Sequence, residues 1–243
     1  MSSFSFHGTV RPPRSASEAK RVQILAPVLA VIQLATIAAE LVTASAFEPS
    51  YNWVKNTISE LGVAPCTTDF DAREHVEACS PLADVMNVSM MVSGLALLLL
   101  AISLRHSRGF AGVPGILWII AGVGSIVTGF VTLDTSPVAH QLVSMPLFFG
   151  GPLAILTGAF QLQGRPRTTG IALGVCALVL GVVFSTSDLV YGFGGIVERL
   201  VIWPSLVWVV YLTFAARRVA LAQPRNPTSV AHYNTEELDV QYS

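Results

Sequence analysis

Six apolar stretches, each close to the length that a helix needs to cross a bilayer, dominate this chain of 243 residues. They cover about 22–46, 82–104, 111–133, 138–162, 169–189 and 196–216. A helix needs roughly 20 mostly apolar residues to span the hydrocarbon core. Only helices and closed barrels satisfy the backbone in lipid, and runs such as Leu95–Leu100 lack the alternation of a barrel strand. The sequence therefore predicts an all-α membrane protein, a bundle of six transmembrane helices.

The apolar stretches leave little of the chain for anything else. Charged residues make up 12% of the sequence and hydrophobic residues 52%, whereas soluble domains carry roughly 25% charged residues. The end segments 1–21 and 217–243 are polar and contain several prolines. Segments of this composition bury too little apolar surface to fold. We therefore expect two disordered tails on either side of one membrane domain, 22–216.

The cations are distributed unevenly over the connections between the stretches. If the stretches alternate in direction, eleven of the 14 Lys and Arg residues fall on one side: Arg11, Arg14, Lys20, Arg21, Arg105, Arg108, Arg165, Arg167, Arg217, Arg218 and Arg225. Only Lys55, Arg73 and Arg199 fall on the other side. Connections rich in Lys and Arg stay in the cytoplasm. The pattern predicts two cytoplasmic termini and an external connection over 47–81.

The external connection contains a helical pattern of its own. Val54, Ile58 and Leu61 recur at spacings of four and three residues, which is the period of one face of a helix. We expect a short helix over 53–62, lying on the outer membrane surface.

Polar residues interrupt the first and last apolar stretches. One face of the first stretch is polar at helical spacing, through Gln33, Thr36, Glu40 and Thr43. We expect this face to point into the bundle, because ionisable groups inside a membrane need a partner. Arg199, at the start of the last stretch, needs one too. We expect it to pair with Glu40, Glu198 or Asp84.

The segment between the third and fourth stretches combines a helix start with ionisable groups. Ser136 followed by Pro137 is typical of an N-cap and a first helical residue. His140 then lies in the first turn, with Ser144 one turn deeper on the same face. Because a helix N-terminus disfavours a cation, we expect a neutral imidazole that can act as a base. His140, Ser144 and Asp134 are therefore the candidate catalytic residues.

Several of these residues also fit purely structural roles. Thr57 and Glu60 match a capping box, so Glu60 can close its own helix. Asp134 suits the start of the fourth transmembrane helix. Glu198 and Arg199 are neighbours in the sequence and can form ion pairs within the bundle.

Three segments of the chain resemble a known family. They are Asn56–Gly62, Asp134–Ser144 and Gly195–Arg199. Together they resemble the bacterial multi-pass membrane proteins grouped as domain of unknown function 998 (DUF998), a six-span family without an established activity. The resemblance covers most of 22–216 and implies a protein of the bacterial inner membrane. It also implies a shared polar site, because all three segments lie at the same membrane face.

We expect these polar residues to form an outward-facing pocket. Its candidate residues are Glu40, Asn56, Ser59, Glu60, Asp84, Glu198 and Arg199. The favoured function is binding, sensing or the stabilisation of a membrane-protein partner. The alternative is a membrane-embedded hydrolase or transferase acting on a lipid or lipid-linked group. In that case His140 would be the base and Ser59 or Ser144 the nucleophile, although no nucleophile-elbow motif is present. A small transporter is the third possibility.

The sequence predicts neither a metal nor a cofactor. His75 is the only other histidine expected on the outer side, so a histidine-rich zinc site is not expected. Nucleotide-binding fingerprints and DNA-binding patterns are absent from the sequence. The expected partners are membrane lipids and a second membrane protein, and no nucleic acid.

Cys66 and Cys79, which lie in the external connection, are predicted to form a disulfide. The outside of a cell membrane is oxidising, and Cys176 lies within the fifth stretch, out of their reach. Such a bridge would stabilise the fold by roughly 3 kcal/mol through the unfolded state. Mass mapping of non-reduced protein from its native membrane should find the linked peptide pair. Two free thiols would contradict the prediction.

Overall fold

The computed structural model describes residues 17, 20–48, 50–64, 80–186 and 190–222. In these ranges the long elements are helices, and no β-strand is present: α2 (Ala26–Ser45), α3 (Ala83–Ser103), α4 (Val113–Phe130), α5 (Pro137–Ala159), α6 (Arg165–Thr186) and α7 (Val190–Ala222). A π-helical turn, η2 (Arg21–Leu25), precedes α2, and a 3₁₀ turn, η3 (Ser59–Gly62), lies between α2 and α3. The predicted all-α, six-helix architecture is confirmed. Cys66 and Cys79 lie outside the described residues, as does most of both predicted tails.

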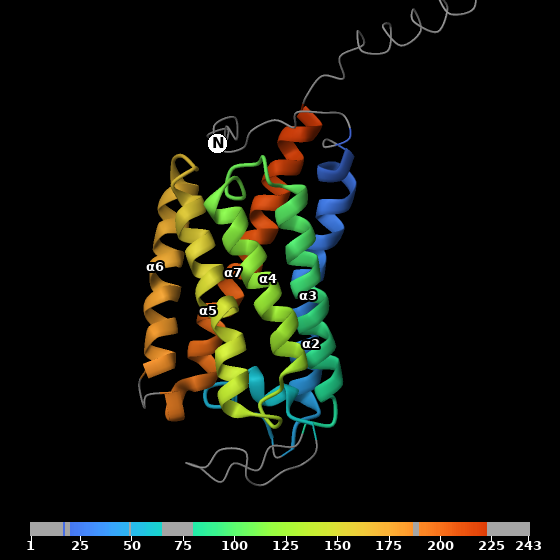
Figure 1. Ribbon diagram of the computed structural model, residues 1–243, viewed down its shortest axis with the longest axis vertical. Helices are drawn as coiled ribbons and strands as arrows, with labels where there is room; N and C mark the ends of the chain where they lie inside the picture. The colour runs from blue at the N-terminus through green and yellow to red at the C-terminus, as the bar shows by residue number, and fades with distance from the viewer. Residues whose placement is uncertain (1–16, 18–19, 49, 65–79, 187–189, 223–243) are drawn as a thin grey trace, which may run out of the picture.

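The six helices run alternately up and down (Figure 1). Consecutive helices pack against each other, and α7 also packs against α2 and α5. The beginning of the first helix and the end of the last lie at one end of the bundle, the terminal end, where Gln23 Nε2 donates to the carbonyl of Ala220 at 2.9 Å. The opposite end, the loop end, carries segments 46–64 and 131–136.

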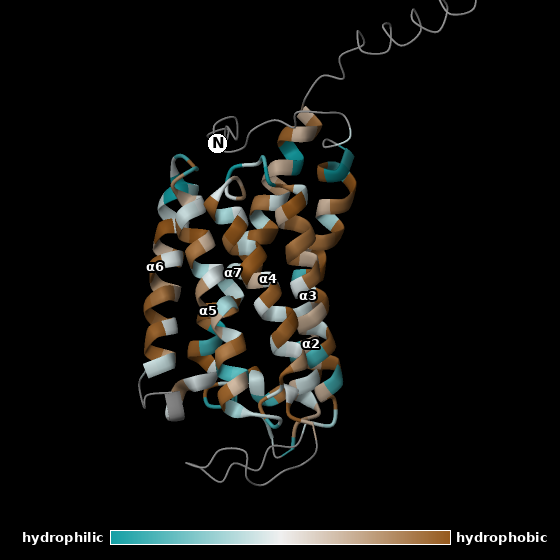
Figure 2. Ribbon diagram, in the orientation of Figure 1, coloured by the Kyte–Doolittle hydropathy of each residue, from teal (hydrophilic) through white to brown (hydrophobic). Residues whose placement is uncertain are grey.

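The outward faces of the helices are largely apolar (Figure 2). Val28, Leu95 and Val179 leave 59%, 53% and 56% of their surface exposed. Exposed aliphatic side chains are unfavourable in water and well placed in lipid. All six helices are long and apolar enough to cross a membrane. The chain is therefore a multi-pass membrane protein.

Two helices extend beyond the predicted membrane spans, into polar residues at the start of α6 and the end of α7 and into the glycine-rich stretch 190–195 at the start of α7. α6 begins at Arg165 instead of about residue 169, and α7 runs over Val190–Ala222 instead of about 196–216. Hydropathy marks only the part of a helix that suits lipid, whereas its backbone hydrogen bonds continue into the polar flanks. Arg217 and Arg218 were expected in a disordered tail, but they belong to the last turns of α7.

The predicted surface helix over 53–62 is wrong in extent, since only η3 is helical. The backbone before η3 is bound by α7 instead. The N–H of Gly195 donates to the carbonyl of Lys55 at 3.0 Å, and that of Ile196 to the carbonyl of Val54 at 3.2 Å. These carbonyls are directed at α7 and not at the amide four residues on, as a helix requires. The segment therefore lies against the start of α7.

Small residues bring α3 and α4 into close contact. A Cβ at Gly94 would lie 2.5 Å from the carbonyl oxygen of Gly122, and a Cβ at Gly122 would lie 2.8 Å from that of Gly94. Ser125, on the same helix as Gly122, donates to the carbonyl of Met90 at 2.8 Å. Such residues let membrane helices approach closely, and they fix the position of α3 beside the site described below.

A methyl group at Gly94 should destabilise the bundle. Gly94→Ala forces α3 and α4 apart, and overpacking of this kind costs roughly 1–3 kcal/mol. Gly192→Ala is the matched control, because nothing lies within 4 Å of a Cβ at that helical position. Thermal unfolding in detergent should show a clearly lower melting temperature for Gly94→Ala and an unchanged one for Gly192→Ala. Equal melting temperatures would refute the close contact.

Candidate functional site

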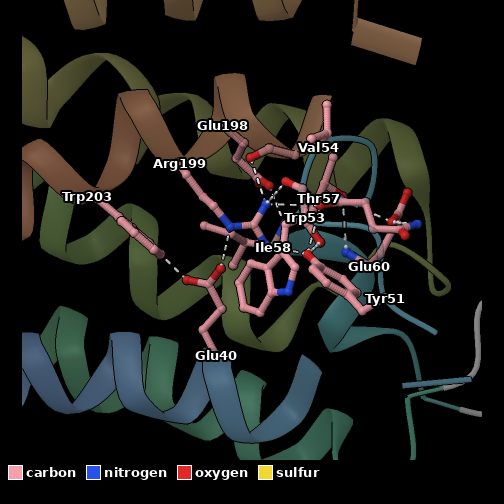
Figure 3. Close-up of polar contacts among 12 residues, drawn as sticks. Glu40, Tyr51, Trp53, Val54, Thr57, Ile58, Glu60, Glu198, Arg199 and Trp203 are labelled. Carbon is pink, nitrogen blue, oxygen red and sulfur yellow. Dashed lines mark hydrogen bonds and ion pairs between the residues drawn. The ribbon is translucent and has the colours of Figure 1, made fainter. Parts of the chain in front are cut away.

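A buried ion pair joins α7 to α2 near the loop end. Arg199 Nε donates to Glu40 Oε1 at 2.7 Å. The second carboxylate oxygen, Oε2, accepts from the indole N–H of Trp203 at 2.9 Å (Figure 3). Glu40 and Arg199 are only 2% and 6% exposed. Both oxygens of the carboxylate are thus bonded, as a buried charge requires.

The rest of the Arg199 guanidinium holds the segment that leads to η3. Nη2 donates to the Tyr51 hydroxyl at 2.5 Å. Nη1 shares its hydrogens among three carbonyls, those of Gly195 (2.7 Å), Asn56 (3.1 Å) and Trp53 (3.2 Å). The guanidinium carbon also lies 4.8 Å from the centre of the Trp53 ring and 5.4 Å from that of Tyr51. Arg199 therefore connects α2, α7 and residues 51–56.

Tyr51 takes part in this network as a neutral phenol. Burial raises the pKa of its hydroxyl above the ordinary value, although the charge of Arg199 acts in the opposite direction. The hydroxyl lies 2.8 Å from the carbonyl oxygen of Asn56 and 2.7 Å from that of Thr57, and these two acceptors share its single hydrogen. It can therefore accept from Arg199 and donate to the backbone at the same time.

Gly195 makes the close approach of this segment possible. A Cβ at Gly195 would collide with the carbonyl oxygen of Asn56 and would lie 2.8 Å from that of Trp53. The Gly195–Arg199 segment thus presents a bare backbone at one position and a guanidinium one helical turn later. Both features are needed to bind the carbonyls of the 51–56 segment.

A second polar cluster lies on another face of α7. Glu198, which is 1% exposed, accepts the backbone N–H of Ile58 at Oε2, and its Oε1 lies 3.0 Å from Ser59 Oγ. Ser59 Oγ is also 3.0 Å from His140 Nε2. The other ring nitrogen, Nδ1, lies 2.7 Å from the carbonyl oxygen of Val131. Side chains from α7, η3 and α5 therefore form one continuous set of contacts.

A small cavity adjoins this second cluster. It measures about 20 Å³ as the space open to the centre of a water molecule, and a single water needs roughly 10–15 Å³ by that measure. Its polar lining is Ser59, Asn87, Thr128, Thr132, His140, Ser144 and Glu198. The cavity can hold a water-sized, hydrogen-bonding molecule against a serine, a histidine and a carboxylate.

The structure divides the predicted site residues between these two clusters. Ser59, His140, Ser144 and Glu198 line the cavity. Ser144 does not reach His140, because its hydroxyl donates to the carbonyl of Gln141 at 2.9 Å.

The remaining pocket residues lie with the ion pair or outside both clusters. Glu40, Asn56 and Arg199 belong to the ion-pair network. Glu60 Oε2 accepts from Asn56 Nδ2 at 2.7 Å and from the backbone N–H of Thr57 at 3.1 Å, as the capping-box alternative predicts.

Two predicted acidic residues do not line the cavity. Asp84 is exposed in the first turn of α3, a favourable position for an anion at a helix N-terminus. Asn87, on the same helix, lines the cavity. Asp134 is half-buried before α5, and its Oδ1 has no hydrogen-bond partner among the described residues. Ser136 caps α5 as predicted, accepting the N–H of Ala139 at 3.3 Å.

The sequence did not identify Tyr51 and Trp203 of the ion-pair network, nor Asn87, Thr128 and Thr132 of the cavity. Trp203 lies four residues after Arg199 and hence on the same helix face, which was a usable signal. No sequence signal identified Tyr51, because its contact with Arg199 depends on how the loop folds back. The carbonyl of Val131, which binds His140, has no side-chain signature at all.

An apolar groove lies between α6 and α7. Its volume is about 720 Å³, within the 300–1,000 Å³ range that is usual for ligand pockets. Arg199 and Trp203 line it near the loop end, and Arg165 lines it near the terminal end. Glu198, His140 and Ser59 do not line the groove, so a lipid chain lying in it meets the ion-pair side of α7.

Removing Arg199 should strongly destabilise the protein. Arg199→Ala leaves Glu40 buried without its cation, and stranding one member of a buried pair costs about 3–5 kcal/mol. Arg105→Ala is the control, because Arg105 is exposed and substitutions at such sites change stability by about 0.5 kcal/mol or less. Thermal unfolding in detergent should show a much lower melting temperature for Arg199→Ala than for Arg105→Ala. An unchanged melting temperature for Arg199→Ala would refute the central role of the pair.

Comparison with known proteins gives a family and no activity. No curated protein and no solved structure matches the chain. The sequence profile described as "Protein of unknown function (DUF998)" matches residues 24–215. This range includes every residue of the two clusters, from Glu40 in α2 to Trp203 in α7. The chain therefore belongs to the DUF998 family.

Proposed function

We propose that the chain is a protein of the bacterial inner membrane, with both termini in the cytoplasm and the loop end outside. The charges of the described helices support this orientation. Eight cations lie at the terminal end: Lys20, Arg21, Arg105, Arg108, Arg165, Arg167, Arg217 and Arg218. At the loop end the described cations are Lys55 and Arg199, and Arg199 is neutralised by Glu40. Cation-rich connections stay in the cytoplasm.

The function supported best is non-enzymatic binding at the external face, with sensing of the bound molecule. One observation carries this proposal: Ser59 contacts both Glu198 and His140 at the edge of a cavity of about 20 Å³. Ionisable residues within a membrane are costly unless they have a partner or a role. Arg199 and Glu40 are partners, whereas the Glu198 cluster faces open space that fits a small hydrogen-bonding ligand.

The arrangement of the cluster favours binding over acyl-transfer catalysis. In a nucleophilic triad the carboxylate holds Nδ1 of the histidine, and Nε2 accepts the proton of the serine. Here the carbonyl of Val131 occupies Nδ1 of His140, and the carboxylate of Glu198 lies against Ser59. Glu198 therefore competes with His140 for the serine proton and does not orient the base.

A membrane-embedded hydrolase or transferase is the second candidate. Ser59 lies within hydrogen-bond reach of His140, as a serine nucleophile and its base must. The groove of about 720 Å³ between α6 and α7 could hold the chain of a lipid-linked substrate. The groove lies on the Arg199 side of α7, however, so such a substrate would have to reach Ser59 past the ion-pair network.

Ser59→Cys should react with a small, membrane-impermeant thiol reagent added to intact cells. The experiment needs Cys66, Cys79 and Cys176 replaced by serine. Ser59 is half-buried beside the cavity and should be reached from outside. Ser93→Cys is the control, because Ser93 is 3% exposed and bonded to Gln33 deep in the bundle.

Three outcomes of this experiment are informative. Modification of the Ser59→Cys variant, and not of the Ser93→Cys control, supports an external binding site. Modification only after the cells are opened would place the loop end in the cytoplasm and contradict the proposed orientation. Stable labelling of the unsubstituted protein at Ser59 by a fluorophosphonate would support the hydrolase instead.

A further inference from the structure

We infer that Glu198, Ser59 and His140 together bind one proton, which all three groups share. This inference rests on the proposed binding function and names the ligand of that site: the proton, delivered by water from the loop end. It follows from counting the hydrogen atoms that the observed contacts require.

The orientation of the His140 imidazole fixes one hydrogen. Nδ1 lies 2.7 Å from the carbonyl oxygen of Val131, and a carbonyl can only accept. Nδ1 therefore carries a hydrogen. Neutral imidazole has a single N–H, so Nε2, 3.0 Å from Ser59, is an acceptor unless His140 is an imidazolium.

The hydroxyl of Ser59 then has too few hydrogens for its neighbours. It can donate one hydrogen, but Glu198 Oε1 and His140 Nε2 both lie at 3.0 Å from its oxygen. With an ionised Glu198 and a neutral His140, both neighbours are acceptors, and one of the two contacts would bring lone pairs together. A buried acceptor left without a donor costs roughly 1–3 kcal/mol.

One additional proton satisfies every contact. If the proton is on Glu198, the carboxyl group donates to Ser59, and Ser59 donates to His140. If it is on His140, the imidazolium donates to Ser59, and Ser59 donates to Glu198. In both cases Glu198 Oε2 still accepts the backbone N–H of Ile58. Groups coupled in this way titrate as a unit, so the proton belongs to the cluster.

The charges around the cluster support a bound proton. From α2 and α7, Glu40 and Arg199 act on Glu198, but these two groups are paired with each other. Asp134, from the segment before α5, acts on His140. The other polar residues that line the cavity, from α3, α4 and α5, are uncharged: Asn87, Thr128, Thr132 and Ser144. Among these groups, no cation remains to balance an ionised Glu198, so a proton is the available source of positive charge.

The bound proton holds three elements together. Ser59, in η3, can bridge α5 and α7 only while the proton is present, because it needs a donor on one side and an acceptor on the other. After deprotonation Ser59 can bond to His140 or to Glu198, but not to both. The contact between η3 and the bundle then weakens as the outside becomes more alkaline.

Glu198→Gln is the decisive variant. The amide of glutamine can donate to Ser59 and accept from Ile58, which reproduces the protonated arrangement without a titratable proton. This substitution leaves the Arg199–Glu40 pair intact.

The proton should be visible directly in protein at about pH 7, where free carboxyl groups are ionised and free imidazole is mostly neutral. Infrared spectroscopy should find a protonated carboxyl group, or ¹⁵N NMR of labelled histidine an imidazolium. This signal should be present in the wild type and absent from Glu198→Gln. An ionised Glu198 together with a neutral His140 in the folded wild type would overturn the inference.

Stability against pH is the second readout, and its sign is fixed. At about pH 7 the folded cluster holds a proton that free carboxyl and imidazole groups have already released, so stability falls as the pH rises from there, until the folded cluster loses the proton too. A difference of one proton changes the folding equilibrium constant about tenfold per pH unit. Glu198→Gln should lose this component of the slope. An identical slope in wild type and variant would refute the shared proton.

The two hypotheses can fail independently. If the Ser59→Cys variant is modified from outside but no protonated group is found in the wild type, the external site stands and its ligand is not the proton. If the proton is found but the Ser59→Cys variant reacts only in opened cells, the shared proton stands and the proposed external orientation is wrong.

Discussion

The buried pair of Arg199 and Glu40 determines how the loop end is built. A guanidinium among membrane helices must have all its donors satisfied, and one carboxylate cannot accept them all. The remaining donors bind Tyr51 and the backbone carbonyls of residues 51–56. The segment therefore lies against α7, in the conformation that satisfies the donors of the Arg199 guanidinium. The ion pair therefore fixes the conformation of residues 51–56 and also joins α2 to α7.

The position of the second cluster depends on this arrangement. Ile58 and Ser59 follow the segment that Arg199 binds, so their N–H and hydroxyl groups come to rest against Glu198. Because Glu198 and Arg199 are consecutive, they point to different faces of α7 while sharing its backbone. A change at either cluster must move the same loop. Binding of a ligand or a proton beside Ser59 is thus coupled to the segment that lies at the loop end of α2 and α7.

The sequence was informative wherever one helix alone decides the outcome. The six spans follow from apolar length, the buried stripe of α2 from helical spacing, and the cap at Ser136 from local backbone chemistry. It was uninformative where two distant segments meet. The helix predicted over 53–62 failed because α7 takes the carbonyls that a helix would use. Asp84 was expected in the pocket, but the side chain that lines it is Asn87, a choice set by the rotation of α3 against α4.

The two clusters differ in a way that separates structure from function. Around Arg199 both carboxylate oxygens of Glu40 have a donor, and the two hydrogens of Nη1 face three carbonyl oxygens. Around Ser59 there is one hydrogen for two acceptors, next to space for a water. Natural proteins satisfy buried polar groups almost completely, so a cluster short of hydrogens beside an open cavity is where a ligand that supplies them is expected. The Arg199–Glu40 pair stabilises the fold, and the cluster around Ser59 is the part that can respond to a bound molecule.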